Sequence, residues 1–496
     1  MIQGNAATGG VTAPPRDPVA GALPPRWRRE LWTVLAVVLA VKLAVLAVDH
    51  VPRVFLGDSV TYLHGALDGV IPRDRSFVYS MLIALTAVPA HSLLALVLAQ
   101  TVAGALAATI VYAIARGGLG LGALLSGALA VLTALEPAQL FYERMVMAEA
   151  FGGLAWFGFI GCAVAYFRDG DWRWLPAAAV CGLAAASLRM NGLAVLLAVG
   201  GLLPAWRWLL HAPARACGRR CLGAHLALAI ACTSILHVGY RHLVGHLTHA
   251  PPGYIGIAGV FELGMVAPLV QPADFEGTGC PPDILRRIGV PLRDATMRES
   301  QIWRDDGLWP VMRRTCRNAE QAAAIVAERA LSERPWGLLP MAAAIIGQYF
   351  DPVAERWRMD SDLGRLDLGA DFAALLRQNF NLDARGIPHQ VTLASSWFEH
   401  AREWFTLTFL LLPFLAATAL LRARDEAPAA TALALMSLVL SVSALLFQHI
   451  ISYRYLHPYP PLFLLLIAWL AIARPGRRRQ VPAAGVMKVS PETRSG

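Results

Sequence analysis

Apolar stretches long enough to cross a lipid bilayer recur along the chain, and they restrict its possible folds more than any other feature. A helix needs about 20 such residues to span about 30 Å of hydrocarbon. Only 16% of the 496 residues are charged, against about a quarter in soluble domains. We therefore predict an all-α integral membrane protein with about ten transmembrane helices, with interfacial helices and a large loop region on the outer face. The predicted spans are residues 31–50, 91–115, 119–136, 145–167 and 174–188, a sixth that returns to Trp206, and 222–243, 403–421, 428–447 and 459–473.

Arginines between these spans predict the orientation of the chain. Short cytoplasmic loops of multi-pass proteins carry an excess of positive charge. We expect a bacterial plasma (inner) membrane protein with both termini cytoplasmic. Much of the formal charge of +9 lies in these loops, so it does not indicate a nucleic-acid partner. The arginines concerned are Arg116, Arg168, Arg173, Arg207, Arg219, Arg220, Arg422 and Arg424.

The chain divides into terminal tails, two membrane modules and one long loop region. Residues 1–26 and 475–496 are expected to be disordered cytoplasmic tails, because they lack an apolar core of signal-peptide type. Residues 27–245 form an N-terminal transmembrane module whose first outer loop is 51–90, and residues 403–474 form the C-terminal transmembrane helices. Within the first outer loop, the apolar run before Pro89 is too short to span and predicts an interfacial helix.

Residues 246–402 form the large periplasmic or extracellular loop region. A loop of this length without secondary structure is unusual, so we expect it to pack as interfacial helices over the outer face. Residues 318–333 have helical spacing and precede a Pro-Trp pair that ends the helix. Cys280 and Cys316 lie in this region, and the sequence leaves a disulfide and two free thiols equally open.

The first outer loop holds the residue that we predict to be catalytic. Asp58 lies between Gly57 and Ser59 at the mouth of the helix bundle, where its carboxylate can take a proton from an acceptor hydroxyl. The alternative is that Asp58 or Ser59 caps a helix over residues 60–67.

Polar residues at other span ends on the same side are predicted to bind a substrate. Glu149 lies one turn inside the fourth span, where an acid is costly unless it faces a cavity or a partner; pairing with Arg189 or Arg454 is the rival interpretation. Guanidinium groups grip phosphate bidentately, although snorkelling to lipid headgroups explains outer arginines equally simply. Lys42, inside the first span, is predicted to pair with a buried acid. The predicted substrate-binding residues are Tyr62, Arg73, Arg75, Glu149, Arg189, His449, Arg454 and Tyr455, and no metal ligands are assigned.

The segment before the last span combines aromatic and basic residues. Tyr453, Arg454 and Tyr455 are flanked by His449 and His457. Such a group can stack on a sugar or a prenyl chain. Aromatic belts at membrane interfaces produce the same pattern, so the pattern alone does not separate the two.

Together these features resemble the GT-C-type polytopic membrane glycosyltransferases, the superfamily that includes protein mannosyltransferases and aminoarabinose transferases and uses polyprenyl-phosphate sugars. The resemblance covers most of the chain topologically. Many relatives carry a second acid directly beside the first-loop acid, and here Ser59 stands in that place. The motifs that carry the resemblance are Gly57-Asp58-Ser59-x-x-Tyr62, Arg73-x-Arg75-Ser76-x-x-Tyr79, Glu149, Arg189 with Gly192, the segment Ala327–Trp336, and Arg454-Tyr455 before Pro458, Pro460 and Pro461.

This resemblance implies an inverting sugar transfer from a polyprenyl-phosphate donor to an acceptor hydroxyl on a glycan, lipid or protein. Asp58 would be the general base, while Arg189 and Arg454 would stabilise the departing lipid phosphate. Such a site needs no metal in principle, and a divalent cation that bridges acid and phosphate is the open alternative. The rival class is a transporter or flippase for a lipid-linked or anionic solute, which should show broken helices in corresponding halves.

Overall fold

The structure is a computed structural model that describes residues 25–473, and this range is helical without any named β-strand. Eight helical segments in the range are long and apolar enough to cross a membrane. The prediction of an all-α membrane fold is confirmed at this level. Apart from Pro25 and Arg26, with which helix α1 begins, the predicted tails 1–26 and 475–496 lie outside the described residues.

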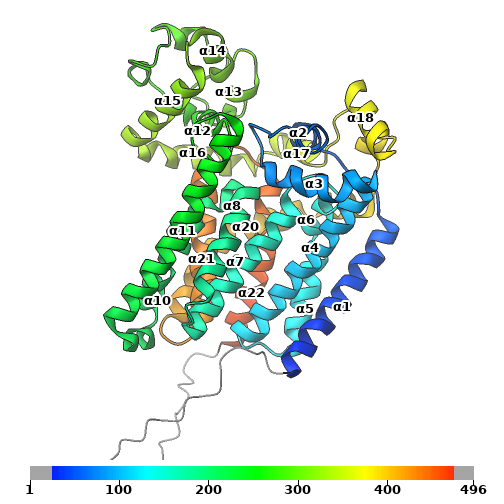
Figure 1. The fold of residues 1–496 in the computed structure, drawn as a ribbon, viewed down its shortest axis with the longest axis vertical. Coiled ribbons are helices and arrows are strands. Elements are labelled where there is room, and N and C mark those ends of the chain that lie inside the picture. The colour runs from blue at the N-terminus through cyan, green and yellow to red at the C-terminus, as the bar shows by residue number, and fades with distance from the viewer. Residues whose placement is uncertain (1–24, 474–496) are drawn as a thin grey trace, which may run out of the picture.

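The eight segments follow the predicted spans closely. Their long helices run side by side as a bundle (Figure 1). The segments are Arg26–Val48, Leu93–Gly118, Glu149–Asp169, Leu193–Leu210, Ala212–Thr248, Arg402–Ala423, Pro428–Phe447 and Tyr453–Ile472. Their main helices are α1 (Pro25–Val48), α4 (Leu93–Ala113), α7 (Glu149–Asp169), α11 (Gly218–Thr248), α20 (Arg402–Ala423), α21 (Pro428–Phe447) and α22 (Tyr459–Ile472).

Two further predicted spans correspond to shorter apolar helices. They are α5 (Ala123–Ala134) and α8 (Trp174–Leu188). A helix of 15 residues rises only about 22 Å, less than the hydrocarbon thickness. Both nevertheless pack within the bundle, α5 against α4 and α8 against α7 (Figure 1).

The sixth predicted span is helical but broken. It consists of α9 (Leu193–Ala198), a 3-10 turn over Gly200–Leu202, and α10 (Leu203–Leu210). Pro204 lies in the first turn of α10, where its missing N–H removes a bond that would continue the preceding helix. A methyl group added at Gly200 would lie 3.1 Å from the Phe159 ring. The break therefore lets the chain approach α7 closely.

The arginine-rich loops gather at one end of the bundle. Arg168 donates through Nη1 to the Gly117 carbonyl at 2.9 Å, and Arg207 donates through Nε to the Phe167 carbonyl at 2.9 Å. The backbone N–H of Asp425 donates to the Leu210 carbonyl. Helix α1 begins and α22 ends near these contacts (Figure 1). The segments predicted to share one side of the membrane thus meet at one end.

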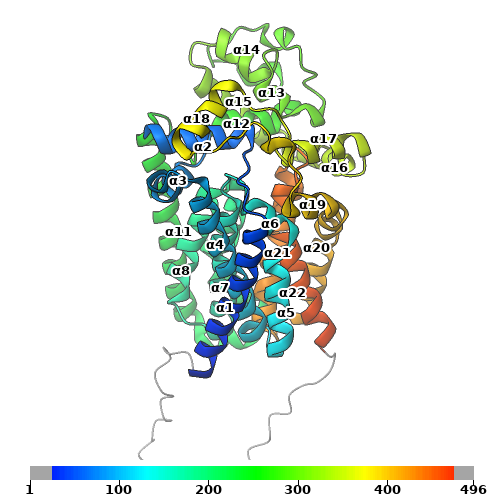
Figure 2. The ribbon, with the colours of Figure 1, turned by 90° about the vertical axis from the view of Figure 1, so that its right-hand side faces the viewer.

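Residues 250–401, called the cap below, cover the opposite end of the bundle (Figures 1 and 2). The cap has its own apolar core, which includes Val260, Val311 and Ala323. The helix predicted over 318–333 is confirmed as α15. The cap helices are α12 (Ala258–Val266), α13 (Ser300–Trp303), α14 (Leu308–Thr315), α15 (Ala319–Glu333), α16 (Leu338–Gln348), α17 (Pro352–Asp362), α18 (Ala370–Phe380) and α19 (Leu393–His400).

Two helices of the first outer loop lie across the end of the bundle beneath the cap. They are α2 (Leu56–Asp68) and α3 (Phe77–Ala90) (Figure 1). The helix predicted before Pro89 is confirmed as α3, which includes this proline in its last turn.

Disulfides occur at both ends of the molecule. Cys280–Cys316 joins two loops of the cap, which resolves the alternative left open by the sequence. Cys217–Cys221 closes the first turn of α11 at the arginine-rich end.

Candidate functional site

A short backbone pairing brings the first outer loop beside the start of α7. The N–H of Arg53 donates to the Arg144 carbonyl at 2.7 Å, and the N–H of Val146 donates to the Arg53 carbonyl at 2.9 Å. The Ser59 hydroxyl adds a bond to the Val146 carbonyl at 2.8 Å. These contacts tie the first turn of α2 to the segment that leads to Glu149.

Asp58 is a buried carboxylate held by two arginines. Arg75 Nε donates to Oδ1 at 2.8 Å and Arg454 Nη1 donates to Oδ2 at 2.9 Å. The alternative that Asp58 or Ser59 is a helix cap is wrong, because α2 begins at Leu56 with Phe55 as its N-cap. Burial alone would raise the pKa of Asp58, but the positive charges of Arg75, Arg454 and Arg189 hold this pKa well below its usual range. Asp58 is therefore ionised throughout the physiological pH range.

Glu149 is the first residue of α7, and its side chain is buried beside Arg189. Arg189 Nη2 lies 2.8 Å from Glu149 Oε1, so the predicted pairing is present. The two groups are not in hydrogen-bond geometry, and neither carboxylate oxygen of Glu149 has a hydrogen-bond partner. Because unpaired buried polar atoms are rare, these oxygens are the first sign of a ligand site.

The Tyr455 ring lies close to two guanidinium groups. Its centroid is 5.0 Å from the Arg454 guanidinium carbon and 5.4 Å from that of Arg189. Arg454 Nη2 also donates to the Tyr455 hydroxyl at 3.2 Å. The ring face attracts both cations, which allows two like charges to remain close together.

The cap positions Arg454. Asp362, in α17, accepts hydrogen bonds from the Ser452 hydroxyl and from the Tyr453 N–H at 2.8–3.0 Å. Tyr349, at the end of α16, accepts from the Ser452 N–H at 3.3 Å. The 3-10 turn that begins at Tyr453 and carries Arg454 is thus fixed from above by the cap.

These side chains border a small cavity (≈ 40 Å³) between α7, α8 and the start of α22. One water needs about 10–15 Å³ measured in this way, so the cavity holds a few waters or a small polar group. Buried atoms here without a hydrogen-bond partner are Glu149 Oε1 and Oε2, Arg189 Nη2, Arg454 Nε and Trp156 Nε1, of which Glu149 Oε1 and Arg189 Nη2 form an ion pair with each other. The residues that line the cavity are Glu149, Gly152, Gly153, Trp156, Ala185, Arg189, Gly192, Leu440, Arg454, His457 and Pro458.

The charges around this site do not cancel. Arg75, Arg189 and Arg454 face Asp58 and Glu149, which leaves one positive charge among five largely buried groups. Asp74 approaches Arg75 at 3.5 Å from the edge of this group and is 26% exposed, so it offsets only part of the surplus. The buried group therefore suits a ligand with a single negative charge.

The remaining predicted residues divide into near and distant ones. Tyr62 lies one turn from Asp58, buried edge-to-face against Tyr79 at 4.7 Å. His449 lies 6.2 Å from the Tyr455 ring, and burial with help from neighbouring arginines lowers the pKa of His449 to about 3. Arg73 is not brought to the cavity.

Arg73 instead forms an exposed ion pair with Glu320 of α15 at 2.7 Å. It thus links the first outer loop to the cap, at a distance from the buried charges. Its neighbour Arg75 reaches Asp58, so the two arginines of this loop have different positions.

Sequence reasoning left three site residues unassigned. His457, rather than His449, lines the cavity, and Trp156 does so from α7. Glu143 is fully buried and is the acid that pairs with Lys42. Lys42 in an apolar span predicted a buried acid as its partner, but the sequence did not identify which acid.

No metal centre is visible in the part of the chain that the structure describes. Within residues 25–473 no three His, Cys, Asp or Glu side chains gather in a way that could hold an ion. A divalent cation therefore stays a prediction.

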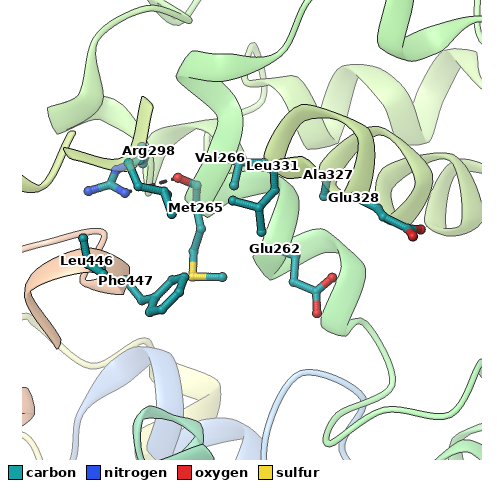
Figure 3. Close-up of a pocket in the computed structure, with 10 residues that line it drawn as sticks. Glu262, Met265, Val266, Arg298, Ala327, Glu328, Leu331, Leu446 and Phe447 are labelled. Atoms are coloured by element: carbon teal, nitrogen blue, oxygen red, sulfur yellow. Dashed lines mark hydrogen bonds between the residues drawn. The ribbon is translucent and has the colours of Figure 1, made fainter. Parts of the chain in front are cut away.

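A second cavity lies between the cap and the end of α21 (Figure 3). Arg298 lies at one side of it, with Glu262 and Glu328 at the other. The donors of Arg298 are used by the carbonyls of Ala295, Met265 and Gln448 at 2.8–3.2 Å. The rest of the lining is apolar, and none of these three charged side chains has a buried atom without a hydrogen-bond partner of the kind found in Glu149.

Comparisons with protein-family models, with curated proteins and with solved structures find no match to this chain.

Proposed function

We propose that this protein is a GT-C-type membrane glycosyltransferase that moves a sugar from a polyprenyl-phosphate donor to an acceptor hydroxyl, with inversion. The observation that carries the proposal is the buried group of three arginines and two carboxylates beside a small cavity. A polyprenyl-phosphate sugar is a phosphodiester with one negative charge. Its charge matches the single positive charge that the site leaves uncompensated.

The arginines give the donor a way to activate the base. When the phosphate binds Arg189 and Arg454, it competes with Asp58 and Glu149 for the same guanidinium groups. Asp58 then loses part of the positive charge that lowers its pKa, so it becomes a better proton acceptor.

The transfer follows from these positions. Asp58 takes the proton of the acceptor hydroxyl, and the hydroxyl oxygen attacks the anomeric carbon. The bond from that carbon to the phosphate oxygen breaks, and its electron pair leaves with the lipid phosphate. Arg189 and Arg454 stabilise the charge that develops there.

The membrane orientation is part of the proposal. The arginine-rich end is placed in the cytoplasm of a bacterial cell by the positive-inside rule, which puts the capped end at the periplasmic or outer face. The two disulfides lie at opposite ends and therefore do not decide the orientation. Exposed aromatic residues of the cap would contact outer-leaflet lipids: Trp336, Phe350, Trp357 and Trp397.

The test uses purified protein in detergent with a panel of polyprenyl-phosphate sugars. We expect wild type to release polyprenyl phosphate and Asp58→Asn to lose about 100-fold or more of this rate while it still binds the lipid. Asp68→Asn is the matched control, because Asp68 lies on the same helix, exposed and paired with His64. Equal turnover by Asp58→Asn would transfer the role of base to another acid such as Glu149.

One observation favours the transporter alternative. The segment Leu193–Leu210 is broken beside α7, and broken helices form solute sites in transporters. Absence of turnover with every donor, together with lipid flipping in liposomes, would establish that class.

A further inference from the structure

A chain of buried polar side chains runs from the first span to the cavity. Lys42 Nζ contacts Glu143 Oε1, and Gln139 Nε2 donates to the same oxygen at 2.7 Å. On its other side, Gln139 Oε1 lies 2.8 Å from His457 Nε2. All four side chains are at most 4% exposed.

The order of donors and acceptors in this chain fixes the histidine tautomer. Lys42 can only donate, so the Glu143 carboxylate accepts. The Gln139 group that faces Glu143 must then be its NH₂, which leaves Gln139 Oε1 to face His457. Because that oxygen can only accept, His457 Nε2 must carry the proton. In the neutral ring, Nδ1 is then a hydrogen-bond acceptor.

This free nitrogen belongs to a ring that lines the cavity, close to the cavity wall at Gly153. His457 lines the cavity with Glu149, Trp156 and Arg454. A methyl group added at Gly153, which also lines the cavity, would lie 3.6 Å from Nδ1. Within residues 25–473 no hydrogen bond to Nδ1 is formed, although the side chain is only 4% exposed.

We infer that His457 accepts a hydrogen bond through Nδ1 from a hydroxyl group of the donor's sugar, and that Lys42, Glu143 and Gln139 are positioning residues that hold this tautomer. The identity of the ligand rests on the proposed function, whereas the tautomer does not. The sugar is bonded to the phosphate that Arg454 and Arg189 hold, and His457 lines the same cavity as both arginines. A hydroxyl group of the sugar is small enough for this cavity, so it can reach the nitrogen while the phosphate stays on the arginines.

The buried ion pair of Lys42 and Glu143 has a role in this arrangement. Burying Lys42 and Glu143 costs desolvation energy that their attraction only partly recovers, and apolar residues of the same size are often as stable. A carboxylate at the end of the chain has an effect that apolar residues lack, because it orients the Gln139 amide.

The first arm of the test needs no substrate. Nitrogen and carbon NMR of histidine-labelled protein in detergent reports the tautomer of each ring, and the signal lost in His457→Asn identifies His457. We expect the Nε2–H tautomer in wild type and a mixture of tautomers in Gln139→Leu. The Nδ1–H tautomer in wild type, or an unchanged signal in Gln139→Leu, would overturn the inference.

The second arm compares two amides at position 457. In His457→Asn the side-chain oxygen can occupy the place of Nδ1, whereas His457→Gln reaches Gln139 but puts no acceptor there. We expect the donor KM to rise about 10-fold in His457→Gln, as for one lost hydrogen bond of about 1.4 kcal/mol, with kcat little changed. In His457→Asn the rise should be at most about 3-fold.

The outcomes separate the hydroxyl contact to Nδ1 from the positioning chain that holds the tautomer. Equal effects of both substitutions on KM, or a loss of kcat alone, would refute the hydroxyl contact. If wild type turns over no donor while the Nε2–H tautomer is found, the proposed function fails and the positioning chain stands.

Discussion

Lys42→Met should strongly destabilise the bundle, because it leaves the Glu143 carboxylate buried without its lysine. Both side chains of the pair are completely buried. Removing one partner of a buried pair costs about 3–5 kcal/mol, mostly from the charge left behind. Glu143 keeps Arg144 at 3.2 Å and Gln139 at 2.7 Å, so we expect the low end, about 3 kcal/mol. Methionine fills the volume of the lysine stem, which keeps packing changes small.

The assay is equilibrium unfolding in mixed detergent micelles, with the midpoint compared between variants. The double variant Lys42→Met with Glu143→Gln removes both charges of the pair, but it also takes the acid from buried Arg144, which keeps its hydrogen bonds to two carbonyls. It should therefore regain at most about 1 kcal/mol relative to the single variant. Arg26→Met is the control, since its pair with Glu30 is exposed and should contribute nothing measurable. A single variant as stable as the control, or a double variant less stable than the single one, would refute the reasoning.

Three further predictions concern packing, pH and the cap. Gly104→Ala should destabilise the protein by about 1–3 kcal/mol, because the added methyl group collides with Glu143 Oε1 and meets Gln139 Nε2 at 2.6 Å. Gly127→Ala, with open space around it, should be neutral or stabilising in the same unfolding assay. The pKa of His449 is lowered to about 3 in the folded protein. Below about pH 6.5 the unfolded chain therefore binds a proton that the folded protein does not, and the free energy of unfolding falls as the pH drops. Unfolding midpoints at pH 7 and pH 5 should show a smaller loss of stability in His449→Gln than in wild type. Cys280→Ser should make the cap lose about 3–4 kcal/mol, the chain-entropy value for its 36-residue separation; unchanged protease resistance of this variant would contradict a bonded pair.

Apolar patterning predicted the helices of the bundle well, because each span must bury its backbone polar groups within itself. The predicted span 428–447 matches α21 residue for residue, and 174–188 matches α8. The break in the sixth span was not predicted, because the hydropathy is continuous across Gly200 while the α-helix is interrupted there.

The kind of site and the Glu149–Arg189 pair were predictable from the sequence, but most other contacts between its side chains were not. Polar residues at span ends on one side pointed to a common site, and Asp58, Arg75 and Arg454 do meet there. Which histidine faces the cavity depends on the 3-10 turn over Tyr453–Leu456, whose phase the sequence does not reveal. Contacts between residues far apart in the chain, such as Lys42 with Glu143, likewise follow only from the packed bundle.

The cap anchors the backbone beside Arg454, and this contact links the position of the cap to the ion pair of Asp58. Asp362 holds the backbone beside Arg454, and Arg454 holds Asp58 on the bundle side. If α17 moved away from the bundle, it would therefore pull on Arg454 and weaken the ion pair between Arg454 and Asp58. Arg454 would then couple opening of the cap to release of the Asp58 carboxylate.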